Sequence, residues 1–101
     1  MKGISMEIEE ALGLLKYLVS HDHFHIVNRR DVMAQPVSRE LAKSIVQQLQ
    51  ASDFQGHERN RNNPTQFVWI FITDDGERYY IKFVFVENDS RVVFISFHVS
   101  Y

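Results

Sequence analysis

The sequence predicts an α+β domain: two N-terminal helices packed on one face of a C-terminal antiparallel sheet, a three-stranded meander with room for a short extra strand. Three observations lead to this prediction. The first half of the chain has two stretches with apolar residues at helical spacing. The second half has three stretches that alternate between apolar and polar residues, and they follow the helical ones. Helices followed by strands are typical of α+β domains.

The length of 101 residues predicts a single domain, 1–101, and a composition of 45% hydrophobic and 24% charged residues is ordinary for a globular protein. No apolar run approaches the roughly 18 residues of a membrane span, and the N-terminus turns acidic at once. We therefore expect no membrane segment and no signal peptide. The absence of cysteine fits a cytoplasmic protein and excludes thiolate metal sites. A net charge of −2 argues against a general nucleic-acid binder, so any polyanion site should be a local patch.

Helical spacing predicts a first helix over residues 5–20, with Ser5 as a candidate N-cap, and a second that begins after the N-cap Ser38 and ends near Gln50. The apolar stripe of the first helix is Ile8, Leu12, Leu15 and Val19, and that of the second is Leu41, Ile45, Val46 and Leu49. Between them, Phe24 and Ile26 can form a short extended piece.

The second half predicts a loop over residues 51–66 and strands over residues 67–73, 78–86 and 91–99. Asp75-Gly76 is a two-residue hairpin signal, because the turns that suit it need positive φ at both central positions. With that loop, Ile72 faces Tyr79. Alternation along the strands then puts Trp69 and Phe71 on the same face of the sheet as Tyr80 and Lys82.

The third strand contains one wholly apolar set, which we assign to the face covered by helices: Val93, Ile95, Phe97 and Val99. This choice requires an odd loop, most simply Asn88-Asp89-Ser90, before the strand. It sets His98 opposite Tyr80 and Ser96 opposite Lys82, on the face away from the helices.

A phenol, an ammonium and an imidazole would thus share one patch, with four charged or imidazole side chains in the preceding loop. This combination suits metal-free RNA cleavage, in which the 2′-hydroxyl needs a base, the leaving 5′-oxygen an acid and the phosphorane cations. The candidate catalytic residues are His98, Lys82, Tyr80 and Arg61, and the candidate substrate-binding residues are His57, Glu58, Arg59, Trp69 and Ser96. The alternatives are a solvated sheet face with a cross-strand Tyr–His pair, and a tryptophan that packs in the core.

The stretch "HDHFH" places His21, His23 and His25 at alternate positions around Asp22. In a strand the three imidazoles would share a face and could hold a metal. A polar helix end is the alternative, because the helix dipole favours histidine there. We expect no metal or other cofactor in the site.

Three strings, "LQASDFQGHERNRNNPTQFVWIF", "RYYIKF" and "VVFISFH", resemble the MqsR-type toxins of bacterial type II toxin–antitoxin systems. The resemblance covers residues 24–98. It implies a RelE/barnase-like fold and a metal-independent endoribonuclease (an mRNA interferase) that cleaves messenger RNA. The implied partners are RNA, a cognate antitoxin and, as a further candidate, the ribosome. The matching positions are Tyr80, Lys82, His98, Glu58, Arg59 and Arg61.

The chain departs from better-known relatives at three places. They have a lysine near the position of Gly56–His57, a glutamine where this chain has Ile70, and in some members a lysine in place of His98. These departures, with the near-neutral charge, support an alternative function: a non-catalytic protein-binding module or a degenerate toxin.

Overall fold

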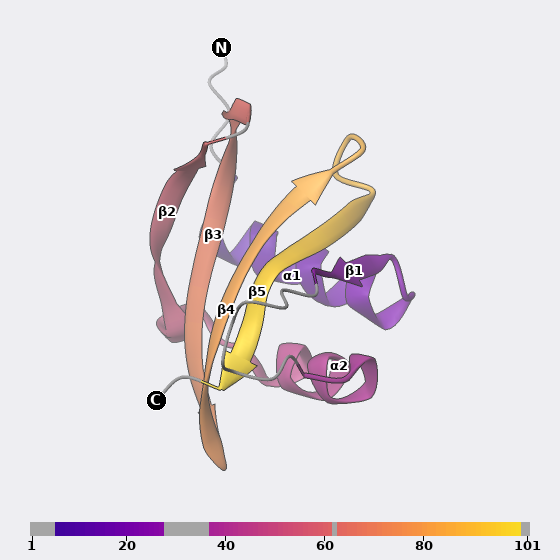
Figure 1. Ribbon diagram of the computed structural model, residues 1–101, viewed down its shortest axis with the longest axis vertical. Helices are drawn as coiled ribbons and strands as arrows, with labels where there is room; N and C mark the ends of the chain where they lie inside the picture. The colour runs from indigo at the N-terminus through magenta and orange to yellow at the C-terminus, as the bar shows by residue number, and fades with distance from the viewer. Residues whose placement is uncertain (1–5, 28–36, 62, 100–101) are drawn as a thin grey trace.

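The computed structural model describes residues 6–27, 37–61 and 63–99 (Figure 1). Within these residues it has two helices and a five-stranded mixed sheet, in chain order α1 (Ile8–Ser20), β1 (Phe24–Ile26), α2 (Arg39–Gln48), a 3₁₀ turn (Ala51–Asp53), β2 (Phe54–Asn60), β3 (Asn63–Asp75), β4 (Glu77–Val86) and β5 (Arg91–Val99). The α+β class is thus confirmed, and the sheet is wider than the predicted meander. No helix in the described part of the chain is long and apolar enough to cross a membrane.

The strands lie in the order β1-β5-β4-β3-β2. The short strand β1 runs parallel to β5, and all other neighbours are antiparallel. The predicted loop over residues 51–66 was wrong, because this segment contains the 3₁₀ turn, all of β2 and the start of β3. Strand β2 was not predicted because its charged residues interrupt the alternation of apolar and polar side chains. An edge strand tolerates such charges because it has a neighbour on only one side.

Both predicted helices are confirmed, with small shifts at their ends. The backbone of α1 begins after Glu7, which forms a reciprocal capping box with Glu10, whereas the predicted cap Ser5 lies outside the described residues. The hydroxyl of Ser38 caps α2 as predicted and accepts a hydrogen bond from the Leu41 N–H at 3.1 Å. Leu41 itself stays 38% exposed, so it does not belong to the buried stripe.

The two helices cover one face of the sheet, and the core lies between the helices and this face (Figure 1). The largest side chains that the sheet contributes to this core are Phe24, Trp69, Phe71, Ile81, Phe83, Phe94 and Phe97. Their rings make edge contacts with one another, such as 5.9 Å between the centroids of Phe83 and Phe94. The sheet face opposite the helices is called the open face below.

The β3–β4 hairpin differs from the predicted one by a single residue. Asp74 pairs with Arg78 and Asp75 with Glu77, which leaves Gly76 alone at the tip with a φ of 80°. An ion pair of 3.4 Å joins the Arg78 and Asp74 side chains across the two strands. A slip of one residue turns every side chain of a strand to the other face.

The slip corrects the predicted faces of β3. Trp69 and Phe71, expected on the open face, are 5% and 0% exposed in the core. Val68, Ile70 and Ile72 take their places on the open face, and Ile72 pairs with Tyr80 instead of Tyr79.

The β4–β5 turn also differs from the prediction, but the predicted pairs of Tyr80 with His98 and of Lys82 with Ser96 are kept. Val86 pairs with Arg91, so the loop has four residues, Glu87 to Ser90, instead of three. A β-bulge then leaves Ile95 without a partner on β4, because Phe83 pairs with Phe94 and Lys82 with Ser96. The extra residue restores the predicted register over the second half of β5. Before the bulge the faces are reversed: Val92 and Phe94 are buried in the core, while Val93 lies on the open face.

Asp22 links the end of α1 to α2 and gives a prediction on pH. Its carboxylate accepts a 2.9 Å hydrogen bond from Lys43 and lies 3.6 Å from Arg39. The Lys43 ammonium, assisted by Arg39, holds the pKa of Asp22 below its ordinary value. A lowered folded-state pKa contributes stability above the unfolded-state value, and this stability is lost as pH falls through the folded-state value.

We therefore expect Asp22→Asn to be slightly less stable than the wild type at pH 7, with a difference that begins to shrink as pH falls through about 4 and is lost below the folded-state pKa of Asp22. Asparagine tolerates the positive φ of 63° at this position, so the backbone should not change. Urea unfolding of both proteins between pH 7 and pH 2.5 measures the difference. Lys43→Met should abolish most of it, and a difference of equal size at every pH would contradict the assignment.

Candidate functional site

The candidate site lies on the open face, where β4 and β5 bring four polar side chains together. Tyr80 pairs with His98 and Lys82 pairs with Ser96, as the sequence predicts. The rings of Tyr80 and His98 are 5.6 Å apart between centroids and tilted by 31°. Diagonal neighbours on adjacent strands have Cβ atoms about 7–8 Å apart, which brings Lys82 within reach of a group bound at His98.

The imidazole of His98 is half-buried and held by one hydrogen bond. Its Nδ1 lies 3.0 Å from the carbonyl oxygen of Val99. A carbonyl only accepts hydrogen bonds, so Nδ1 must carry the hydrogen in this contact. The neutral ring then has its free lone pair on Nε2, which makes this atom available as a proton acceptor.

Lys82 is bound to an acid from the edge of the sheet. Its Nζ lies 3.0 Å from Oε1 of Glu58 on β2, and the side chains are 25% and 51% exposed. The contact spans β3, because β2 and β4 lie on either side of that strand. The sequence grouped Glu58 with the site, but in a loop, and did not predict this ion pair.

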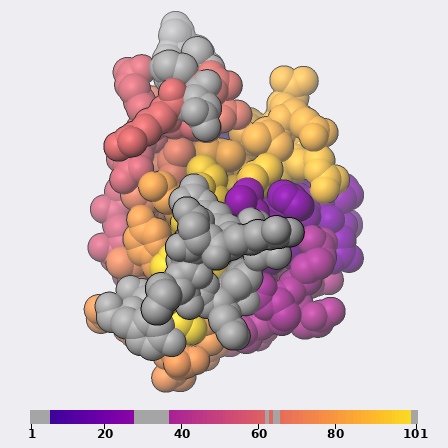
Figure 2. Space-filling view, viewed as in Figure 1, coloured from indigo at the N-terminus to yellow at the C-terminus, as the bar shows by residue number. Residues whose placement is uncertain are grey.

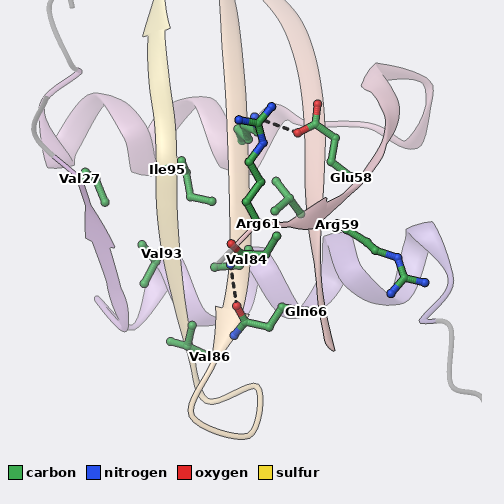
Figure 3. A pocket seen from close by; sticks show the side chains of 12 residues that line it. Val27, Glu58, Arg59, Arg61, Gln66, Val84, Val86, Val93 and Ile95 are labelled. Carbon is green, nitrogen blue, oxygen red and sulfur yellow. Dashed lines mark hydrogen bonds and ion pairs between the residues drawn. The ribbon is translucent and has the colours of Figure 1, made fainter. Parts of the chain in front are cut away.

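A groove of about 600 Å³ continues from this ion pair along the open face (Figure 3). Its aliphatic lining consists of Val27, Val68, Val84, Val86, Val93 and Ile95, and its polar lining of Glu58, Arg59, Asn60, Arg61, Gln66 and Lys82. Val68 and Val84 are only 3% and 4% exposed although they do not belong to the core cluster. Figure 2 views the molecule from this side, with the residues around β2 at its upper left and the β4–β5 turn at its upper right.

The two arginines that follow Glu58 point in different directions. In Figure 3 the Arg61 side chain runs beside β4 in the direction of the Glu58 carboxylate, whereas the Arg59 guanidinium points away from the valines. Arg59 lies 6.0 Å above the ring of Phe67, which faces the same side of the sheet as Trp69. Arg61 is thus the arginine placed to supply charge to the groove.

Two of the predicted substrate-binding residues lie elsewhere. Trp69 is 5% exposed in the core, so the packing alternative holds for it. His57 packs against it with ring centroids 4.3 Å apart and also contacts Phe54. Both side chains face the helix side of the sheet, because the β3 register differs from the predicted one by a residue.

The sequence interpretation missed the groove and its amide pair. Asn60 Nδ2 donates a 2.9 Å hydrogen bond to Oε1 of Gln66, and both residues line the groove. The signal that could have found them is the alternation of Val84 and Val86 with Val68, once Asp75 rather than Asp74 pairs with Glu77.

The histidines of "HDHFH" do not converge on a common point. Asp22 is engaged by Lys43 and Arg39. The His21 ring packs against that of Tyr17, with centroids 4.4 Å apart, and lies 6.2 Å from the ring of His23. Among the residues that the structure describes, no group of three or more His, Cys, Asp or Glu side chains is placed to hold a metal ion.

No protein-family model matches the chain, and no match was found among curated proteins or solved structures. Any proposal of function therefore depends on the residues of the open face.

Proposed function

We propose that the protein is a metal-independent endoribonuclease of the MqsR toxin type, which cleaves messenger RNA and is neutralised by a cognate antitoxin. The observation that carries this proposal is the cross-strand set on the open face. Tyr80 and His98 form one pair, and Lys82 and Ser96 form the next. A proton acceptor, a proton donor and a cation are thus within the span of one phosphodiester.

The proposed roles follow from the hydrogen bonds. Nε2 of His98 takes the proton of the 2′-hydroxyl, because Nδ1 already donates to the Val99 carbonyl. The 2′-oxygen attacks the adjacent phosphorus, and the bond from phosphorus to the 5′-oxygen breaks. The Tyr80 phenol gives its proton to this leaving oxygen. Lys82 and Arg61 stabilise the charge on the phosphorane. The products are a 2′,3′-cyclic phosphate and a 5′-hydroxyl.

A second candidate function is protein binding without catalysis, as in a degenerate toxin. The groove supports it, because its floor is aliphatic and none of the described residues that line it offers an aromatic ring for a nucleobase to stack on. The ion pair between Lys82 and Glu58 supports it as well, since it occupies the cation that RNA would need.

Incubation of the pure wild-type protein with single-stranded RNA in EDTA tests the proposal. We expect cleavage that persists in the chelator and leaves 2′,3′-cyclic phosphate ends, together with growth arrest when the protein is expressed without an antitoxin. Intact RNA combined with harmless expression would overturn the nuclease and favour the protein-binding module.

A further inference from the structure

The ion pair between Glu58 and Lys82 joins two residues that are not on neighbouring strands of the sheet. Glu58 pairs with Val68 and Lys82 with Ile70, so the two backbones stand on opposite sides of β3. Neighbouring strands are about 4.8 Å apart, which separates these backbones by about 10 Å. Both side chains must therefore extend toward each other over β3 to reach the observed 3.0 Å.

The two partners of this ion pair differ in how deeply their side chains are buried. Lys82 stands on the central strand β4 with its side chain 25% exposed, whereas Glu58 is 51% exposed on the edge strand β2. An ion pair with a partner this exposed contributes little to stability. Glu58 can consequently rotate into solvent at low cost, while the aliphatic stem of Lys82 stays packed on the sheet.

The charges around the pair favour exchange of Glu58 for another anion. Among the described residues that line the groove, Glu58 is the only acid, and Lys82 and Arg61 are the cations that do not point away from it. An ammonium donates to carboxylate and phosphate oxygens alike. A phosphate that displaced the carboxylate would meet Lys82 together with Arg61, which also lines the groove and whose side chain runs in the direction of the Glu58 carboxylate (Figure 3).

We infer that Glu58 is an internal competitor: it neutralises Lys82 in the free protein and has to leave before an RNA phosphate binds there. The inference rests on the proposed function for the identity of the anion, a phosphate of single-stranded RNA. Binding then exchanges one anion for another at Lys82, which lowers the affinity and the salt dependence that this cation would otherwise give. The acid thus controls access of RNA to the cation of the site.

The test measures binding without chemistry. A fluorescein-labelled 2′-O-methyl oligonucleotide lacks the attacking hydroxyl, so its binding can be followed by anisotropy whether or not the protein cleaves RNA. Removing one negative charge about 4 Å from a phosphate in water changes affinity about fivefold. We expect Glu58→Gln to bind the oligonucleotide about three to ten times more tightly than the wild type.

The matched control is Glu77→Gln, which changes the net charge equally on the same sheet. Glu77 is exposed and lies five residues from Lys82 along β4, a distance of about 16 Å that exceeds the screening length at physiological salt. Its affinity should stay within twofold of the wild type. Glu58→Ala is the second variant, and it should tighten binding as Glu58→Gln does.

Two further measurements separate competition from a general charge effect. Combining Glu58→Gln with Lys82→Met should cancel most of the gain, because the freed cation is gone. The dependence of log affinity on log salt should steepen by about 0.7 in Glu58→Gln, since an unpaired Lys82 releases a counterion when the phosphate binds.

Equal or weaker binding by Glu58→Gln relative to Glu77→Gln would overturn the inference, and so would a gain that persists without Lys82. These outcomes are independent of the nuclease assay. Tighter binding with no cleavage by the wild type would refute the proposed function alone, whereas cleavage with unchanged binding would refute the competitor alone.

Discussion

Replacing His98 by alanine is expected to lower the rate of RNA cleavage by about 10²- to 10⁴-fold, the usual contribution of a positioned general base. The imidazole is held by its hydrogen bond to the Val99 carbonyl, which leaves Nε2 as the acceptor, and alanine removes both. Single-turnover cleavage of a defined oligonucleotide measures the loss. Binding of the 2′-O-methyl oligonucleotide should change far less, because no anchoring charge is removed.

The control for this variant is His23→Ala, which deletes an exposed imidazole in the turn before β1. It should cleave at the wild-type rate. Equal rates for His98→Ala and the wild type would remove His98 from the mechanism and shift the role of base to another group. Unfolding curves of the three proteins check that a loss of rate is not a loss of fold.

Replacing Phe71 by alanine is expected to cost about 3–5 kcal/mol of the free energy of unfolding, because a fully buried ring leaves a cavity. Phe71 is 0% exposed and packs on Phe83 and Phe54, with centroids 5.9 Å and 5.5 Å away. The whole free energy of unfolding of a domain this size is about 5–15 kcal/mol, so the variant should be only marginally stable at 37 °C. Urea unfolding at 15 °C measures the difference.

Phe67→Ala makes the same substitution on the same strand at a position that is 50% exposed. It should cost well under half as much as Phe71→Ala. The comparison tests the hairpin register, because the two-residue turn expected from the sequence would put both rings on the open face with similar costs. Equal costs for the two variants would contradict the observed pairing of Phe71 with Ile81.

The sequence by itself determined the features that depend on local patterns. Both helices follow from apolar spacing, and the Ser38 cap follows from the residue types around the start of α2. The sequence also predicted the pairing of Tyr80 with His98. That pairing was predicted through an odd loop and is achieved by an even loop with a bulge at Ile95, so the prediction was correct for an incomplete reason.

Only the tertiary structure decided what each face of the sheet carries. The one-residue difference at the Gly76 turn places Trp69 in the core and Val68 in the groove, and no composition rule distinguishes the two turns. The edge strand β2 could not be found from alternation, because its main-chain bonds to β3 stabilise it despite its charges. The ion pair of Glu58 with Lys82 exists only because that edge strand lies two strands from β4. Contacts between strands depend on register, and register is a property of the assembled sheet.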